Sequence, residues 1–210
     1  MTERTTGRTR LAPDRTAVLA LHWQVNVIKP EGFFGGMLAE PVRVSGVVER
    51  AVRFHDDARA AGVPIIFTRF TVPEGEGALV RNTDFMNAVA DAQKSFRPDS
   101  PGAALIPEMS VLGDHDELSD NQRLSGLAAT DLPDRLRARD IDTLLITGVA
   151  TNLTVEQTAR GAADLGFTVH VVADCVAADD PAVHEVSLAN LDMTTAGRLT
   201  AAEAVELLSS

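Results

Sequence analysis

Short apolar runs alternate with amphipathic stretches along most of this chain. The clearest runs cover residues 17–21, 63–67, 143–147 and 168–173. Runs this short, bounded by turn and polar residues, are typical of strands buried on both faces. Strands that alternate with helices favour a parallel sheet with helices packed on both sides. We therefore expect a three-layer α/β/α fold around a central, mostly parallel sheet of about five or six strands.

The intervening stretches predict helices and one long loop. Apolar residues recur at helical spacing after Pro41, which suits the first turn of a helix, and Gly62 suits its end. Residues 96–116 contain three prolines and two glycines and predict a loop of functional or interface character. The polar residues 1–14 predict a flexible N-terminal arm, followed by a single domain over 15–210. The other expected helices cover about 84–94, capped by Thr83, and about 132–139, 152–165, 182–190 and 201–208.

Composition narrows the function classes. The 210 residues carry a net charge of −11, which argues against binding to nucleic acid or to an anionic membrane surface. No apolar stretch is long enough to span a bilayer, and the basic N-terminus lacks the apolar core of a secretory signal. Cys175 is the single cysteine, so an internal disulfide is impossible and a reducing compartment fits. We expect a cytoplasmic protein with no nucleic-acid or membrane partner.

Ligands of open parallel sheets bind beyond the carboxyl ends of the strands. The residues to consider there are His22–Gln24, Thr68–Arg69, Gly148–Thr154 and Asp174–Cys175. No dinucleotide fingerprint, phosphate-binding loop or GxSxG elbow is present, and the histidines lack metal-ligand spacing. We therefore expect neither a cofactor nor a metal. His55, on a predicted helix, is expected to be solvated.

The segment from Leu144 to Arg160 carries the most chemical information. A buried strand passes through a glycine turn into a helix, whose first turn offers free backbone amides and the positive end of the helix dipole. Those groups would activate a nucleophile and stabilise an oxyanion. Every strand-to-helix junction shares these features, so the pattern alone leaves catalysis and a purely structural role equally open.

This segment, TGVATNLTVEQTAR, resembles the signature of the isochorismatase-like hydrolases, also called cysteine hydrolases, which include nicotinamidases, N-carbamoylsarcosine amidases and isochorismatases. RTAVLALHWQ resembles the family's first strand, and LGFTVHVVADCVAADDPAVHEVSLANL its last strand and helix. DELSDNQRLSGLAATDLPDRLRARDIDTLLITGVATN resembles the central stretch. The resemblance is weakest between about residues 70 and 110.

The resemblance implies an Asp–Lys–Cys catalytic triad, and this chain departs from it at all three positions. His22 occupies the aspartate position, Asn121 the lysine position and Thr154 the cysteine position. A threonine hydroxyl is a much weaker nucleophile than a thiolate and needs a nearby base. His22 is the candidate base, with Asp120, Glu156 or Asp174 as candidates to orient its ring. Cys175 lies elsewhere and is interpreted as a packed core residue.

The resemblance also implies a preserved pocket. It implies a cis Val149–Ala150 peptide and an oxyanion site with the amides of Ala150 and Thr154 as donors. We expect pocket contacts from Trp23, Phe33, Phe34, Arg69 and Leu127, with Arg69 holding an anionic substrate group. Trp23 and Leu127 could instead fill the pocket. Trp23 also fits a core role, the two phenylalanines a dimer contact and Arg69 a surface ion pair.

Two functions remain open. In the first, His22, Asn121 and Thr154 form a rebuilt hydrolase site for a small carbonyl-bearing or vinyl-ether substrate. In the second, the protein is a catalytically silent member of the family that binds a small ligand or serves as a subunit. A hydrogen bond between His22 and Thr154 would favour the enzyme. In both cases the long loop and the two phenylalanines predict a homodimer or higher homo-oligomer.

Overall fold

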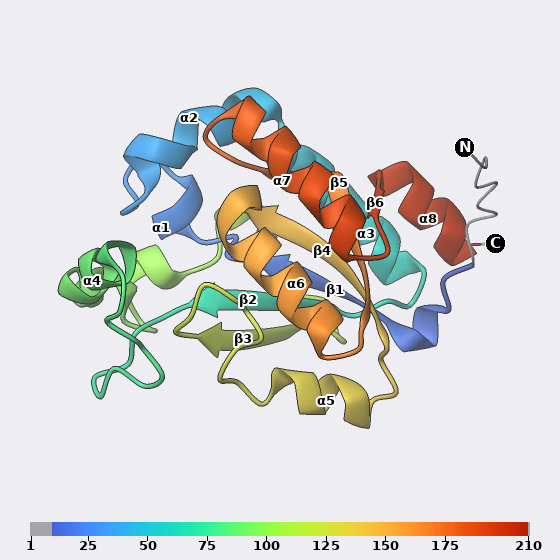
Figure 1. Cartoon of the computed structure of the whole chain (residues 1–210), viewed down its shortest axis with the longest axis horizontal. Helices are drawn as coiled ribbons and strands as arrows, with labels where there is room; N and C mark the ends of the chain where they lie inside the picture. Colours follow the sequence, from blue (N-terminus) through green and yellow to red (C-terminus); the bar gives the residue numbers. More distant parts are fainter. Residues whose placement is uncertain (1–9, 210) are drawn as a thin grey trace.

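The computed structural model describes residues 10–209, which build a six-stranded parallel sheet between two layers of helices (Figure 1). The strand order is β3-β2-β1-β4-β5-β6, and every adjacent pair is parallel. This confirms the predicted three-layer fold. The strands are β1 (Thr16–Leu21), β2 (Ile65–Phe70), β3 (Glu117–Asn121), β4 (Thr143–Val149), β5 (Thr168–Ala177) and β6 (Arg198–Leu199).

The helices cover the two faces of the sheet. One core joins the sheet to α2, α3 and α8, and a second core joins it to α5, α6 and α7. In Figure 1 the strand arrows point toward the end of the molecule where α1 and α4 lie. The helices are α1 (Val25–Ile28), α2 (Gly35–Ser45), α3 (Val47–Ala60), α4 (Asp84–Asp91), α5 (Leu132–Ala138), α6 (Glu156–Asp164), α7 (Pro181–Thr194) and α8 (Ala201–Ser209).

The central strands pack closely because one glycine gives them room. Gly148, near the end of β4, has a φ of +139°, and a Cβ there would lie 2.3 Å from the carbonyl oxygen of Leu21. Only glycine combines that backbone conformation with so close a neighbour. The ends of β1 and β4 are thereby held side by side, which places the residues that follow them at one edge of the sheet.

Three predicted elements need correction. The helix expected from Pro41 onward is two helices, because Gly46 adopts a left-handed conformation with φ of +64° between α2 and α3. Pro41 lies inside α2 rather than in its first turn. The 96–116 segment contains short 3₁₀ turns and the buried residues Phe96 and Ile106, so much of it is packed. The strand β3 follows it, with a polar sequence that gave no apolar signal.

The expected N-terminal arm lies mainly outside the described residues, since only 10–14 of it are described. Within that part, Leu11 is buried in the core, and its amide donates to the carbonyl of Leu207 at 3.0 Å. Leu11 therefore packs with the domain. Among residues 10–209, no helix is long and apolar enough to cross a membrane.

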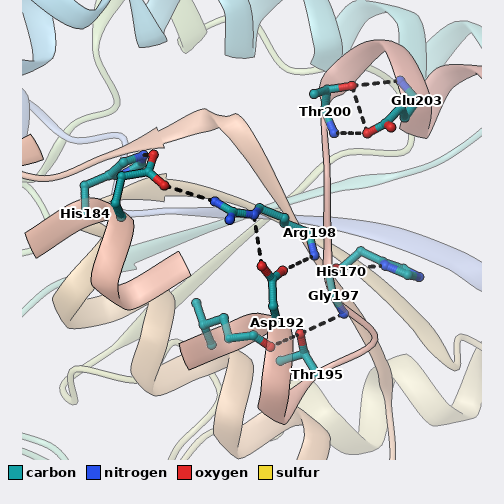
Figure 2. A network of polar contacts seen from close by, with 10 residues as sticks. His170, His184, Asp192, Thr195, Gly197, Arg198, Thr200 and Glu203 are labelled. Carbon is teal, nitrogen blue, oxygen red and sulfur yellow. Dashed lines mark hydrogen bonds and ion pairs between the residues drawn. The ribbon is translucent and has the colours of Figure 1, made fainter. Parts of the chain in front are cut away.

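The C-terminal elements are joined by surface ion pairs around β6. Figure 2 shows Arg198 between the partners that α7 supplies. Its guanidinium lies 3.3 Å from a Glu185 oxygen and 3.0 Å from an Asp192 oxygen. Thr200 and Glu203 exchange hydrogen bonds at the start of α8, a reciprocal cap that satisfies free amides of the first turn.

Candidate ligand-binding site

His22 immediately follows β1, and its backbone is held firmly. Its φ is +54°, a left-handed conformation uncommon for residues other than glycine. The His22 amide donates to the carbonyl of Thr68 at 3.1 Å. The buried Gln24 side chain then joins the chain to its neighbours, donating to Phe70 O at 3.1 Å and Ala103 O at 3.0 Å. These bonds keep the imidazole at the carboxyl edge of the sheet.

Asn121 fixes the tautomer of His22. The Asn121 amide nitrogen donates to the carbonyls of Arg123 and Ser125, so its oxygen faces the imidazole. His22 Nε2 lies 3.1 Å from that oxygen and must carry the proton that forms this hydrogen bond. In the neutral ring Nδ1 then holds the lone pair. His22 and Asn121, two of the three candidate catalytic residues, are therefore joined in one network.

Burial keeps this imidazole uncharged. His22 is 6% exposed, and desolvation lowers its pKa from the ordinary 6.5 to about 4, against the opposing effect of the Asn121 hydrogen bond. None of the three carboxylates proposed to orient the ring bonds to it. Asp120 pairs with Arg69, Glu156 pairs with Arg160, and Asp174 accepts from the amide of Ala201.

Thr154 lies on the π-helical turn η5 (Thr151–Val155), which follows β4. Thr154 and His22 line one small cavity. Thr154 is 2% exposed, and its hydroxyl has no hydrogen-bond partner among the described residues. The His22–Thr154 hydrogen bond that would favour the enzyme is therefore absent. A buried hydroxyl without a partner is unfavourable by about 1–3 kcal/mol.

The backbone around Thr154 matches the expected scaffold. The Val149–Ala150 peptide bond is cis, as the resemblance implies. The carbonyl of Ala150 accepts from the amides of Leu153 and Val155, both at 3.2 Å. From α7, His184 Nδ1 lies 2.9 Å from the buried Thr151 hydroxyl and supports the turn from outside.

The cavity between these groups is small and mostly apolar. Its volume is about 40 Å³, room for roughly three water-sized groups. His22 and Thr154 supply its polar side chains. The remaining lining residues are Val27, Phe34, Met37, Leu38, Phe85, Leu124, Val149, Ala150 and Leu153. A larger surface hollow of about 280 Å³ lies beside His55, but it contains none of the three substituted positions.

Four of the expected pocket contacts lie elsewhere. Trp23 is fully buried and donates from Nε1 to the Thr147 hydroxyl at 3.3 Å, so it is a core residue. Leu127 packs in the core beneath α5 and α6. Arg69 makes a two-pronged ion pair with Asp120, so its anion-binding role is not supported. Phe33 is 40% exposed and contacts Phe34 edge-on without lining the cavity.

The structure adds lining residues that the sequence did not single out. Phe85 and Leu124 come from regions on either side of β3, where the family resemblance was weak or carried no pocket signal. His55 also differs from expectation. It is 1% exposed, and its Nε2 lies 3.0 Å from the Thr147 hydroxyl, so it belongs to the core and is not solvated.

The single thiol is unsuited to nucleophilic chemistry. Cys175 is fully buried in the core, and burial raises its pKa to about 12. The thiolate is therefore a negligible species at neutral pH. Among residues 10–209, no group of three His, Cys, Asp or Glu side chains is placed to hold a metal ion.

Comparison with known proteins gives a consistent result. An isochorismatase domain model matches residues 16–203. The uncharacterised isochorismatase family protein YwoC of Bacillus subtilis is 32% identical over 70% of this chain and 76% of its own length. A ureidoacrylate amidohydrolase, RutB of Methylorubrum extorquens DM4, is 30% identical over 85% of this chain and 77% of its own.

A solved structure shows the same architecture over nearly the whole length. A cysteine hydrolase from Pseudomonas syringae pv. phaseolicola 1448A superposes with a TM-score of 0.83 at 25% identity, covering 96% of both chains. A nicotinamidase, PncA of Bacillus subtilis, superposes with a TM-score of 0.70 at 21% identity. That second likeness concerns the fold alone.

Proposed function

Because this chain belongs to the isochorismatase family of hydrolases, we propose that it keeps the family's pocket for a small carbonyl compound without the thiolate chemistry. His22 and Thr154 hydrogen-bond the ligand, and Asn121 holds the His22 ring. The observation that carries this proposal is the buried Thr154 hydroxyl without a partner beside an uncharged imidazole. A bound carbonyl or amide would supply the missing partner.

The charge of the site favours an uncharged ligand. No Lys, Arg, Asp or Glu from the described part of the chain lines the cavity, and His22 is neutral at physiological pH. A carboxylate would enter this space without a countercharge, at a large desolvation cost. An amide, by contrast, can donate to the His22 Nδ1 lone pair and accept from Thr154. The ligand therefore differs from an acrylate such as the one named for the RutB relatives.

Covalent catalysis by Thr154 receives no support. Its hydroxyl makes no hydrogen bond to a base, and an alcohol without a base is a poor nucleophile. Vinyl-ether hydrolysis needs an acid, and an imidazole with a pKa of about 4 carries almost no proton to give at neutral pH.

One hydrolytic route does have an observation in its favour. Asn121 keeps the His22 Nδ1 lone pair available, and Nδ1 could accept a proton from a water that attacks the bound carbonyl. This second candidate predicts hydrolysis of a reactive ester small enough for the cavity, such as methyl formate. The rate would rise through the His22 pKa of about 4 and vanish in His22→Ala.

The test of the binding proposal uses acetamide as the probe and Thr154→Val as the variant. Acetamide has four heavy atoms, so its binding free energy can be no more favourable than about −6 kcal/mol. We therefore expect millimolar affinity, for which NMR titration is the suitable method. Thr154→Val should abolish binding, while Thr154→Ser should retain it. Acetate serves as the charged control and should not bind. Equal acetamide affinity in wild type and Thr154→Val would overturn the proposal.

The same variant has an opposite effect on stability. Valine replaces an unpartnered buried hydroxyl with a methyl group of similar shape. The free energy of unfolding of Thr154→Val should therefore exceed that of wild type by up to about 1–2 kcal/mol, which shifts unfolding to a higher denaturant concentration. Denaturant unfolding of wild type and Thr154→Val checks this, and it also shows that lost acetamide binding is not caused by lost structure.

A further inference from the structure

Two stacked aromatic rings line the cavity. Phe34, directly before α2, and Phe85, in the first turn of α4, both line it. Their rings stack with centroids 5.5 Å apart and planes 6° from parallel. The two residues come from segments about fifty positions apart, so the stack joins the start of α2 to the start of α4 at the cavity.

The two rings are not equally fixed. Phe34 also contacts Phe33, at 4.8 Å between centroids, and Phe96, at 6.2 Å. Phe85 is half-buried, and its ring contact is with Phe34. The side chain of Thr83 caps α4 by accepting from the amide of Met86 at 3.2 Å, which positions the first turn of the helix and Phe85 with it.

We infer that Phe85 sets the upper size limit of the ligand that this site accepts. The inference rests on the proposed function of the cavity. With the Phe85 ring in place, the cavity measures about 40 Å³, which accommodates an amide head with little attached to it. Phe85 comes from α4, outside the sheet that positions His22 and Thr154. Its ring can therefore be removed without touching the polar groups that bind the carbonyl.

Size discrimination in apolar pockets is substantial. In a well-packed apolar site, one methylene too many weakens recognition of the ligand roughly 10–200-fold. A phenyl ring is much larger than a methylene, so it should be excluded more strongly. Wild-type protein should therefore bind acetamide and exclude benzamide. Phe85→Ala opens the apolar wall and should bind benzamide at least about 10-fold more tightly than wild type does.

The matched control is Phe33→Ala. Phe33 also contributes one ring contact to Phe34, but it does not line the cavity. Both substitutions therefore loosen the aromatic cluster, and only one enlarges the site. NMR titrations with acetamide and with benzamide compare the three proteins, and denaturant unfolding shows that each is folded. If Phe85→Ala does not fold, Phe85→Leu removes the ring while keeping apolar bulk.

The outcome is decided by the ratio of benzamide to acetamide binding. An increase in Phe85→Ala, with Phe33→Ala at the wild-type value, supports the inference; if wild type does not bind acetamide, benzamide affinity alone is compared, and tighter benzamide binding by Phe85→Ala than by wild type and Phe33→Ala supports it. An unchanged ratio in the Phe85 variant, or an equal increase in Phe33→Ala, overturns it. The proposed function fails on a different variant, since it requires that Thr154→Val lose acetamide.

Discussion

Acidification should destabilise this protein in a pH range where its carboxylates still carry charge. Two histidines, His22 and His55, are buried and uncharged in the folded chain. Burial lowers the pKa of His22 to about 4. Burial, aided by the nearby positive charge of Arg59, lowers the pKa of His55 to about 3. The ordinary value for histidine, which applies to the unfolded chain, is 6.5.

The direction in which stability changes with pH follows from proton binding. Between pH 6.5 and the folded-state pKa values, the unfolded chain binds protons that the folded chain does not, so stability rises with pH and falls on acidification. At pH 5 both folded imidazoles are still neutral, and each contributes a loss of about 2 kcal/mol, for a total of about 4 kcal/mol. That is a large part of a typical folding free energy. Carboxylates such as Asp116, whose pKa is lowered because the Arg59 hydrogen bond and charge outweigh desolvation, contribute mainly below about pH 5.

The assay is urea unfolding at pH 8 and at pH 5. Wild type should lose about 4 kcal/mol between them, whereas His22→Gln and His55→Gln should each lose about 2 kcal/mol less than wild type. His115→Gln is the control, because His115 is exposed, and this variant should lose as much stability as wild type does. A wild-type stability that changes by less than about 1 kcal/mol across this range would refute the burial argument.

Further predictions concern the site, the thiol and the assembly. His22→Ala leaves the Asn121 oxygen without a partner and should lower the free energy of unfolding in urea by about 1–3 kcal/mol. His22→Gly suits the φ of +54° and should be more stable than His22→Ala. The reverse order would show that the backbone at this position is not strained. Iodoacetamide should leave Cys175 unmodified in folded protein, because the thiol is buried; labelling detected by mass spectrometry at native pH would contradict this. The exposed apolar side chains include Val44 at 68% and Val186 at 62%, and we propose that a second copy of the chain covers part of this surface. Sedimentation should give a dimer mass, and a monomer mass at every concentration would exclude it.

The scaffold was predictable because many residues specify it redundantly. Four apolar runs, each long enough for a strand, gave the sheet and its layers. The edge strand β3 could not be found in this way, because its sequence ELSDN has only one apolar residue and one face of it is exposed. The break between α2 and α3 depends on one glycine, Gly46, and a helical pattern that continues through it conceals such a break.

The sequence around His55 contains a pattern that indicates burial, but the polar residues next to it obscure that pattern. Asp56 and Asp57 follow it and suggest an exposed helix face. However, Ala51 and Ala58 lie four residues before it and three after it, so all three share one side of the helix. The apolar periodicity places His55 against the sheet, which is where the structure has it.

The site was predictable in its composition and not in its geometry. The family resemblance implies that His22, Asn121 and Thr154 occupy the triad positions, which stays a prediction, and two of these residues form a hydrogen bond. The third, Thr154, does not join them, since its hydroxyl has no hydrogen-bond partner among the described residues. Whether a hydroxyl and an imidazole come within hydrogen-bond distance is decided at the ångström scale. Sequence spacing carries no information at that precision.

The unpartnered hydroxyl of Thr154 separates the requirements of folding from those of ligand binding. Several buried polar groups serve the fold: Gln24 joins the chain after β1 to Phe70 and to Ala103, and the Thr158 hydroxyl accepts from the amide of Gly126 at 3.0 Å. Thr154 has no such role, since valine would fill the same space without leaving a polar atom unpaired. A residue kept for the fold loses stability when it is replaced, and a residue kept for a ligand loses affinity. Thr154→Val is expected to gain stability and lose affinity, and a purely structural role for Thr154 does not produce that combination.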